Sequence, residues 1–248
     1  IGSNKRYPAD YFYQNTMLTI PVFEAARQAG VQKLVYPMGG CSYPATAQSP
    51  INEAQMWDGY PQPESAGYSV AKKMSLVASQ SFRQQYGFNS VVIIPGNMYG
   101  PHDNFRTGDS HVVPGMIRRY YEMKQACAEE IVMWGSGAPT RDFVYVEDVA
   151  RVFPYFIDHY DSSEPVNIST GTSTNIRQLA ETIGRLLGFI GKITWDTSKP
   201  DGQMVKIFDA SRLKSLGLSC PTALEDGLRK TIDWFTRAVE SQSDGIRL

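Results

Sequence analysis

Short apolar runs alternate with longer amphipathic segments along this chain, and that alternation constrains the fold more than any other feature. Residues 33–38 (KLVYPM) and 90–94 (SVVII) are apolar runs bounded by glycine, asparagine or proline. Such runs are typical of strands buried on both faces of a parallel sheet. Between them, residues 65–86 have the length and pattern of a helix. The sequence therefore predicts an α/β fold with a Rossmann-like, doubly wound parallel sheet.

The same alternation continues to the end of the chain. Further strands are expected at residues 130–134, 141–145, 166–169 and 192–195, and further helices at residues 8–29, 175–188 and 223–235. Open α/β sheets bind ligands at the carboxyl ends of their strands. The loops at residues 39–44 and 95–101, which follow two expected strands, are therefore candidate parts of a ligand site.

Composition argues against several classes of partner. Among 248 residues, 24 are Lys or Arg and 25 are Asp or Glu, without blocks of one sign, so no general affinity for nucleic acid or an anionic membrane is expected. No apolar run approaches membrane-spanning length. Cys41, Cys127 and Cys220 have neither metal-ligand spacing nor an even-numbered disulfide pattern, which indicates a reducing cytoplasm and no bound metal.

Tyr68 and Lys72 are four residues apart in the helix expected at residues 65–86. Side chains at this spacing lie one turn apart on one helix face, so a phenol and an ammonium can reach one pocket. Because a nearby cation favours phenolate, we expect Lys72 to lower the pKa of Tyr68. Such a tyrosine can exchange a proton with an alcohol or ketone near neutral pH. Taken alone, a spacing this common is explained better by a Tyr and a Lys on a solvated face of an amphipathic helix.

A set of ordered motifs resembles one family. The motifs are PADYFYQN at residues 8–15, Cys41 with Tyr43 and Pro44, Tyr68 with Lys72, GPHDNF at residues 100–105, SHV at residues 110–112, WGSGAPTR at residues 134–141 and DTSKPDG at residues 196–202. Together they resemble the GDP-L-fucose synthase branch (GDP-4-keto-6-deoxymannose epimerase/reductase) of the extended short-chain dehydrogenase/reductases, in the NAD-dependent epimerase/dehydratase family. The resemblance extends over nearly the whole chain.

The resemblance implies an NADP(H)-dependent enzyme, with NAD(H) as the alternative cofactor, that acts on a nucleotide-diphosphate sugar, expected to be GDP-linked. The reaction would be epimerisation at C3 and C5 of a 4-keto-6-deoxy-hexose followed by reduction at C4. It further implies that residues 1–109 and part of 140–170 form the remainder of a dinucleotide-binding Rossmann domain. Residues 110–248 would form mainly a smaller substrate-binding lobe, interleaved with that domain.

Residue roles follow from the resemblance position by position. Tyr68 matches the catalytic tyrosine and Lys72 the lysine that binds the cofactor ribose. Cys41 and His111 match the base and the acid of epimerisation. The loop that lines the nicotinamide matches Pro95, Asn97 and Met98, and the substrate contacts match Asn97, Arg119, Trp134, Arg141 and Lys199. Asn15 matches an asparagine of a family helix.

A homodimer is expected from two of the helices. Apolar residues lie on more than one side of the helices at residues 8–29 and 65–86, which predicts burial on more than one side. These residues are Tyr11, Phe12, Met17, Leu18 and Val22 in the first helix, and Val70, Met74, Leu76, Val77 and Phe82 in the second. The family that the chain resembles uses this pair in a two-fold contact. Deep packing within one subunit is the alternative explanation.

Two departures from the family pattern bear on activity. The family has a serine two residues before the cysteine, and this serine donates a hydrogen bond to the sugar carbonyl. In this chain Gly39 stands at that position, and Gly40 follows it. A donor of this kind contributes roughly 3 kcal/mol, so slow reduction is expected unless Ser42 compensates. The 248 residues also lack a G-x-x-G-x-x-G phosphate loop. We therefore expect a longer chain, in which a strand, such a turn and a helix precede Ile1.

The sequence leaves two other functions open. A nucleotide-sugar 4-epimerase or 4,6-dehydratase would keep the fold, although residues 39–42 (GGCS) lack the carboxylates that dehydratases place there. A truncated, non-catalytic module that binds a sugar nucleotide would fit the missing phosphate loop and Gly39.

Overall fold

Contacts along the chain divide the protein into two units in the computed structural model, which describes residues 2–241 and 246–248. Unit 1 comprises Ile1–Gly96, Asp148–Thr170 and Phe208–Cys220, and unit 2 comprises Asn97–Glu147, Gly171–Ile207 and Pro221–Leu248. These boundaries differ from the expected ones at two segments. Residues 97–109 belong to unit 2, where residues 97–99 pair with residues 143–145, and residues 208–220 belong to unit 1, where they pack beside residues 166–168. Ile1, before which further chain is expected, lies outside the described residues.

Unit 1 contains a parallel three-stranded sheet in the order β1-β2-β7. Its strands are β1 (Leu34–Pro37), β2 (Ser90–Pro95) and β7 (Val166–Ile168). Every residue of β2 and β7 is buried, as the apolar sequence of residues 90–94 predicts. β1 differs, because it pairs only with β2 among the described residues and Pro37 is exposed. β1 is thus the outermost strand of this sheet among the described residues, and it is less buried than β2.

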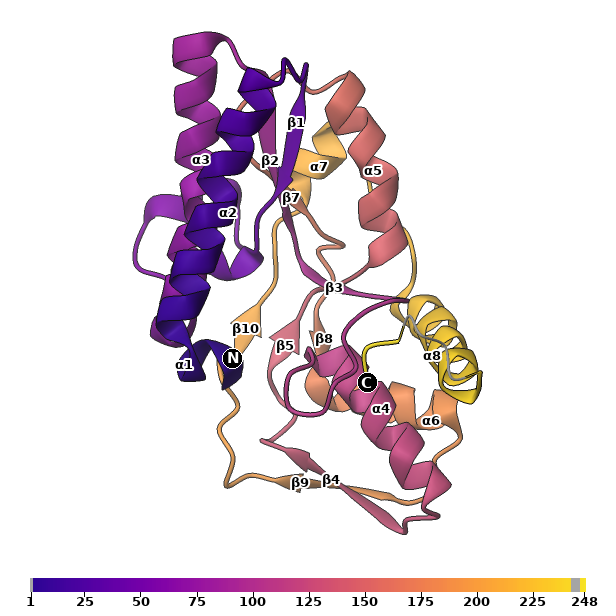
Figure 1. Cartoon of the computed structure of the whole chain (residues 1–248). Coiled ribbons are helices and arrows are strands. Elements are labelled where there is room, and N and C mark those ends of the chain that lie inside the picture. Colours follow the sequence, from indigo (N-terminus) through magenta and orange to yellow (C-terminus); the bar gives the residue numbers. More distant parts are fainter. Residues whose placement is uncertain (1, 242–245) are drawn as a thin grey trace. The chain divides into compact units, whose positions relative to one another are not determined.

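Helices cover both faces of the sheet in unit 1 (Figure 1). They are α1 (Gly2–Arg6), α2 (Pro8–Gln28), α3 (Ala66–Tyr86), α5 (Val146–Asp158, in this unit from Asp148) and α7 (Ser211–Ser215), with the 3-10 turns η1 (Gly40–Ser42), η2 (Glu53–Trp57) and η3 (Pro63–Ser65). Figure 1 shows α2 and α3 on one side of the sheet, packed along each other, and α5 and α7 on the other side. The predicted α/β fold with a parallel sheet between helices is confirmed.

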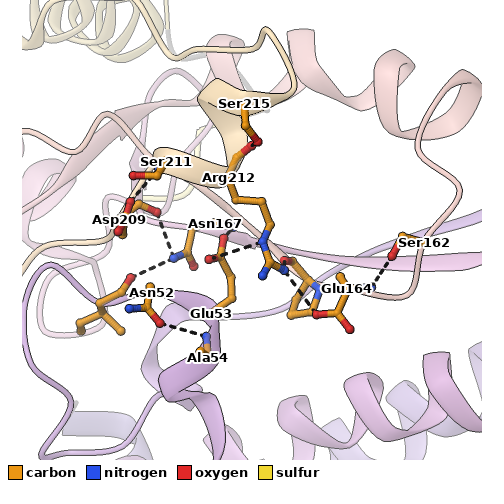
Figure 2. A network of polar contacts seen from close by, with 12 residues as sticks. Asn52, Glu53, Ala54, Ser162, Glu164, Asn167, Asp209, Ser211, Arg212 and Ser215 are labelled. Carbon is orange, nitrogen blue, oxygen red and sulfur yellow. Dashed lines mark hydrogen bonds and ion pairs between the residues drawn. The ribbon is translucent and has the colours of Figure 1, made fainter.

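A buried polar network ties the loop after β1 to the rest of unit 1 (Figure 2). At its centre is Asn167 of β7, whose side chain is fully buried. Its amide nitrogen donates to the carbonyl oxygens of Ile51 at 2.9 Å and Asp209 at 3.2 Å, while its backbone N–H donates to Glu53 at 2.8 Å. Its amide oxygen accepts a 2.6 Å hydrogen bond from the Tyr43 hydroxyl. Because every polar atom of this side chain has a partner, the network fixes the position of Tyr43, two residues after Cys41.

Unit 2 contains short strands and three longer helices. The strands form a parallel pair of β3 (Asn97–Tyr99) with β6 (Phe143–Tyr145), a parallel pair of β4 (Glu130–Trp134) with β9 (Lys192–Asp196), and a three-stranded sheet of β10 (Val205–Lys206), β5 (Thr140–Arg141) and β8 (Thr174–Asn175). The helices are α4 (Val112–Gln125), α6 (Ile176–Leu187) and α8 (Leu224–Glu240). The strand expected at residues 141–145 is divided at Asp142, a fully buried residue whose carboxylate accepts a hydrogen bond from the backbone N–H of Gly171.

Among the described residues, no helix has the length and apolar character needed to span a membrane. Those residues also contain no group of three or more His, Cys, Asp or Glu side chains that could hold a metal ion. Cys41, Cys127 and Cys220 form no disulfide within the part of the chain that the structure describes.

Replacing Gly40 with alanine is expected to destabilise unit 1 by about 2 kcal/mol, the usual cost of overpacking a core. A β-carbon at Gly40 would lie 2.5 Å from the ring carbon Cζ of Phe208, which is buried against Tyr43. Equilibrium unfolding in urea measures the change. In a Phe208→Leu background the same alanine is expected to cost less, because the smaller side chain leaves room for it. Equal costs in both backgrounds would contradict this account of Gly40.

Candidate active site

Cys41 lies in the turn that immediately follows β1. Gly39 has an extended backbone and leads into η1 (Gly40–Ser42), which contains Cys41. The Cys41 thiol is partly buried. The hydrogen bond between Tyr43 and Asn167 holds the far end of this turn. The turn thus places a cysteine at the carboxyl end of a sheet strand, where α/β sheets bind ligands.

Gly39 is the point where Cys41 and Tyr68 come together. A β-carbon at Gly39 would lie 3.1 Å from the Tyr68 hydroxyl oxygen and 3.2 Å from the Cys41 sulfur. Tyr68 is in the first turn of α3, partly buried, with its ring edge-on to Tyr11 at 6.3 Å between ring centroids. Two of the predicted catalytic side chains therefore border the same glycine, and their hydroxyl and sulfur atoms already crowd the place that a side chain at Gly39 would occupy.

Burial raises the pKa of Tyr68, and the neighbouring groups Cys41, Tyr36 and Tyr11 raise it further. The expectation that Lys72 lowers this pKa is wrong in this structure. The reason is where the ammonium lies: Lys72 Nζ donates a 3.2 Å hydrogen bond to the hydroxyl of Tyr36. Tyr68 is consequently a neutral phenol at physiological pH, suited to donating a proton.

Lys72 has a partner that the sequence did not indicate. Tyr36, in β1, is 7% exposed, and its hydroxyl lies 2.9 Å from the hydroxyl of Thr19 in α2 as well as next to Lys72. The alternation of side chains along a strand predicts that one face of β1 is buried, but it does not say which side chain a buried phenol meets. Tyr36 and Thr19 were therefore not identifiable as neighbours of Lys72.

Ser42 does not compensate for the glycine at position 39. Its hydroxyl donates a 2.9 Å hydrogen bond to the carbonyl oxygen of Ser69, and the side chain is fully buried. This serine joins η1 to α3 and has no exposed hydroxyl to offer. Asn15 is also engaged locally, because its amide donates to the carbonyl oxygen of Tyr11 in the same helix at 2.7 Å.

Three predicted residues lie at the end of β2 or shortly after it along the chain. Pro95 is the last residue of β2 and is buried in unit 1. Asn97 and Met98 belong to β3 of unit 2. The Asn97 amide donates to the carbonyl oxygen of Asp142 at 2.9 Å, which fixes the side chain against β6. Met98 is exposed on the same strand.

In unit 2, α4 carries two of the predicted residues. His111 is the N-cap residue of α4, and its exposed imidazole accepts no hydrogen bond from the helix. The two arginines of α4 have different environments. Arg118 donates to Glu122 and to the carbonyl oxygen of Phe105, whereas Arg119 has no hydrogen bond or ion pair among the described residues. Arg119 is thus the arginine of this helix that is available for a ligand.

Trp134 and Lys199 are close together in unit 2 because β4 pairs with β9. Trp134 is 71% exposed and is paired with Asp196, whose carbonyl oxygen accepts a hydrogen bond from the Lys199 backbone N–H. Asp201 secures this arrangement, since its carboxylate accepts hydrogen bonds from the backbone N–H of Ser136 at 2.6 Å and from the Ser136 hydroxyl at 2.8 Å. An exposed tryptophan and an exposed lysine thus both lie at one end of this strand pair.

Arg141 lies in β5 of the same unit, beside Lys206 of β10. Its guanidinium donates to the carbonyl oxygen of Thr140 at 2.8 Å, and burial lowers the pKa of Arg141. One guanidinium hydrogen bond inside its own strand leaves further donors for a ligand.

Comparisons with known proteins agree with this chemistry. Residues 1–169 match the NAD dependent epimerase/dehydratase family. GDP-L-fucose synthase 1 of Arabidopsis thaliana is 39% identical over 239 residues, which are 96% of this chain and 74% of the relative. GDP-L-fucose synthase of Escherichia coli is 37% identical over 244 residues, 95% of this chain and 76% of the relative. The structure of a GDP-L-fucose synthetase from Naegleria fowleri bound to NADP has a TM-score of 0.91 and 28% identity, covering 98% of this chain and 76% of that one. This chain therefore belongs to the NAD-dependent epimerase/dehydratase family.

Proposed function

We propose that this protein is an NADP(H)-dependent nucleotide-sugar epimerase/reductase that acts on a GDP-4-keto-6-deoxy-hexose. The observation that carries the proposal is the convergence of Cys41 and Tyr68 on Gly39, which gives one small space a thiol and a proton-donating phenol. The relatives from A. thaliana and E. coli, named GDP-L-fucose synthases, support the same reaction and substrate class. Epimerisation at C3 and C5 precedes reduction at C4 in this proposal.

The proposal assigns the epimerisation to Cys41 and His111. A ketone at C4 acidifies the protons on C3 and C5, so a side-chain base can remove one of them. Cys41, as the thiolate, removes the proton, and His111 returns a proton on the opposite face of the ring. The exposed imidazole of His111 has no competing hydrogen bond in α4, which supports this role.

The proposal assigns the reduction to Tyr68 and Lys72. NADP(H), when bound, supplies the hydride that reaches C4. Tyr68 gives its proton to the C4 oxygen, and the raised pKa of this phenol keeps the proton in place until it is needed.

The residues present fit the ribose end of the cofactor. The Lys72 ammonium has three donors and gives one to Tyr36, so two remain for ribose hydroxyls. Pro95, Asn97 and Met98 are proposed to line the nicotinamide.

The proposal assigns the nucleotide and its diphosphate to residues of unit 2, with Asn97 as a further sugar contact. Arginine suits phosphate oxygens because its planar fork offers paired donors. Arg119 and Arg141 are the proposed diphosphate ligands, supported by the unpaired guanidinium of Arg119 and the spare donors of Arg141. Trp134 is proposed to stack on the base and Lys199 to bind the nucleotide, supported by the exposure of both side chains beside one strand pair.

Calorimetry tests the substrate assignment. The protein is expected to bind GDP-mannose more tightly than UDP-glucose, and to bind NADPH more tightly than NADH. Trp134→Ala should weaken GDP-mannose binding roughly tenfold, because an aromatic contact of this kind is worth about 1.5 kcal/mol. Arg118→Ala is the matched control and should leave binding unchanged, since its partners are Glu122 and Phe105. Equal affinity for both sugar nucleotides would contradict the proposal.

We further propose a homodimer formed through α2 and α3. Large apolar side chains are exposed on both helices: Phe12, Tyr13, Met17 and Leu18 in α2 and Val77 in α3. Such a concentration is unusual on a monomer and is typical of an interaction surface. The mass of the full-length protein by light scattering at micromolar concentration is expected to be twice the mass of one full-length chain. Met17→Glu combined with Leu18→Glu should halve it, and a monomeric mass for the unchanged protein would refute the dimer.

We also propose that the protein acts in the cytoplasm. The supporting observation is that its three cysteines form no disulfide among the described residues, because thiols stay reduced in the cytoplasm. Fractionation of cells followed by detection of the native protein tests the location, and recovery from an oxidising compartment would contradict it.

A further inference from the structure

The hydroxyl of Tyr36 joins the core of unit 1 to Lys72. Tyr36 points from β1 into the space beside α2 and α3, where its ring packs on Phe23 at 5.4 Å between centroids. Its hydroxyl oxygen lies 3.2 Å from Lys72 Nζ and 2.9 Å from the Thr19 hydroxyl. Thr19 is fully buried and Tyr36 is 7% exposed. Lys72 of the proposed active site is therefore hydrogen-bonded to Tyr36, which is itself held in place inside the core.

The direction of the hydrogen bond between Lys72 and Tyr36 follows from the chemistry of the two groups. An ammonium has three donors and no acceptor, so Lys72 must donate and the Tyr36 oxygen must accept. The phenol still has its own proton, and Thr19 offers the hydroxyl that can accept it. The Lys72 nitrogen also lies 5.2 Å from the centre of the Tyr36 ring, a distance at which the ring attracts a cation. The hydrogen bond and the ring contact both hold the Lys72 ammonium beside Tyr36.

This connection ends inside the protein. Thr19 has no exposed surface and, among the described residues, its hydroxyl has Tyr36 as its side-chain partner. A proton wire would have to continue to solvent or to another titratable group. The arrangement is therefore suited to holding Lys72 in place, and it has no exit through which a proton could pass.

We propose that Tyr36 is a positioning residue for Lys72, anchored in turn by Thr19. A lysine side chain loses rotamer entropy when it is fixed on a ligand. The Tyr36 hydroxyl fixes the ammonium before the cofactor arrives, so that binding a ribose orders the side chain less. The inference rests on the proposed role of Lys72 in the epimerase/reductase. It adds a specific residue that determines the strength of cofactor binding.

Tyr36→Phe tests the anchor without disturbing the core, because phenylalanine keeps the ring that packs on Phe23. The first readout is the rate at which acetic anhydride acetylates Lys72 in the cofactor-free protein, followed by mass spectrometry of the peptide. We expect acetylation to be about tenfold faster in the variant, the change expected when one hydrogen bond to a charged group is lost. Thr19→Val, which removes only the outer partner of Tyr36, should give a smaller increase.

Ser79→Ala is the matched control. Ser79 lies in α3 seven residues after Lys72, and its buried hydroxyl is hydrogen-bonded to Ser90 at 2.9 Å and 3.0 Å. Removing it costs a buried hydrogen bond of similar kind and leaves Lys72 untouched, so the Lys72 acetylation rate should stay at the wild-type value. A general loosening of unit 1 would raise the rate in both variants.

The second readout is the split between KM and kcat in NADPH-dependent reduction. Tyr36→Phe is expected to raise KM for NADPH several-fold and to change kcat less than KM. An unchanged Lys72 acetylation rate in Tyr36→Phe would overturn the inference, as would an equal rise in Ser79→Ala. Faster acetylation of Lys72 in a protein that reduces no keto-sugar would support the anchor and refute the proposed function, so the two failures are distinguishable.

Discussion

Tyr68→Phe is expected to slow reduction at C4 by roughly 10³-fold, within the usual range for losing a proton donor. Tyr68 holds a proton that burial and its neighbours stabilise, and its hydroxyl borders Gly39 beside the Cys41 sulfur. Without the hydroxyl, the developing alkoxide at C4 must take its proton from water. The rate of NADPH consumption with GDP-4-keto-6-deoxymannose measures the loss.

Tyr11→Phe provides the control for that substitution. Its ring packs edge-on against Tyr68 at 6.3 Å, so this variant removes a neighbouring hydroxyl and keeps the packing. We expect the rate of reduction by Tyr11→Phe to stay within about twofold of the wild-type rate, because this variant keeps the Tyr68 hydroxyl that donates the proton. A Tyr68→Phe enzyme as fast as Tyr11→Phe would exclude Tyr68 as the proton donor.

Gly39→Ser is expected to accelerate reduction by roughly 10²-fold, the usual effect of one added donor to a developing oxyanion. The backbone at Gly39 has φ −80° and ψ 136°, which any residue adopts. A β-carbon there would lie 3.1 Å from the Tyr68 oxygen and 3.2 Å from the Cys41 sulfur, so both side chains need to move only slightly. The serine hydroxyl would then reach the same space as the phenol of Tyr68. Single-turnover NADPH oxidation measures the gain.

Gly39→Ala separates the hydroxyl from the added bulk. Alanine brings the same β-carbon against Tyr68 and Cys41 and no donor. We expect it to be no faster than the wild type. Equal rates for the serine and alanine variants would show that a missing donor does not limit this enzyme.

Local pattern predicted much of the fold. The strand at residues 130–134 and the helix that ends at residue 86 were predictable, because alternation of side chains and a glycine at the helix end are local signals. β1 was predictable as a strand, but the extent of its burial was not, because that depends on which strands lie beside it. The break in the strand at Asp142 was also not predictable. The buried carboxylate of Asp142 accepts a hydrogen bond from the backbone N–H of Gly171, which is far along the chain.

The candidate site shows the same division. The spacing of Tyr68 and Lys72 correctly predicted a shared helix, but the effect of Lys72 on the pKa of Tyr68 depended on the direction of its ammonium, which Tyr36 determines. Ser42 looked like a replacement donor in the sequence, whereas the fold uses its hydroxyl to bind Ser69. Partners of long or buried polar side chains come from distant segments, so residue order alone does not reveal them.

Proton exchange with solvent tests the central claim most directly. The protein is incubated in heavy water with GDP-4-keto-6-deoxymannose and without NADPH, and deuterium at each ring carbon is measured by NMR. We expect deuterium at C3 and C5, because Cys41 and His111 exchange those protons before any hydride is transferred. Cys41→Ser should reduce the exchange by roughly 10²-fold or more, since a serine hydroxyl is a far weaker base. Absence of deuterium from both carbons in the wild-type protein would contradict the epimerase function.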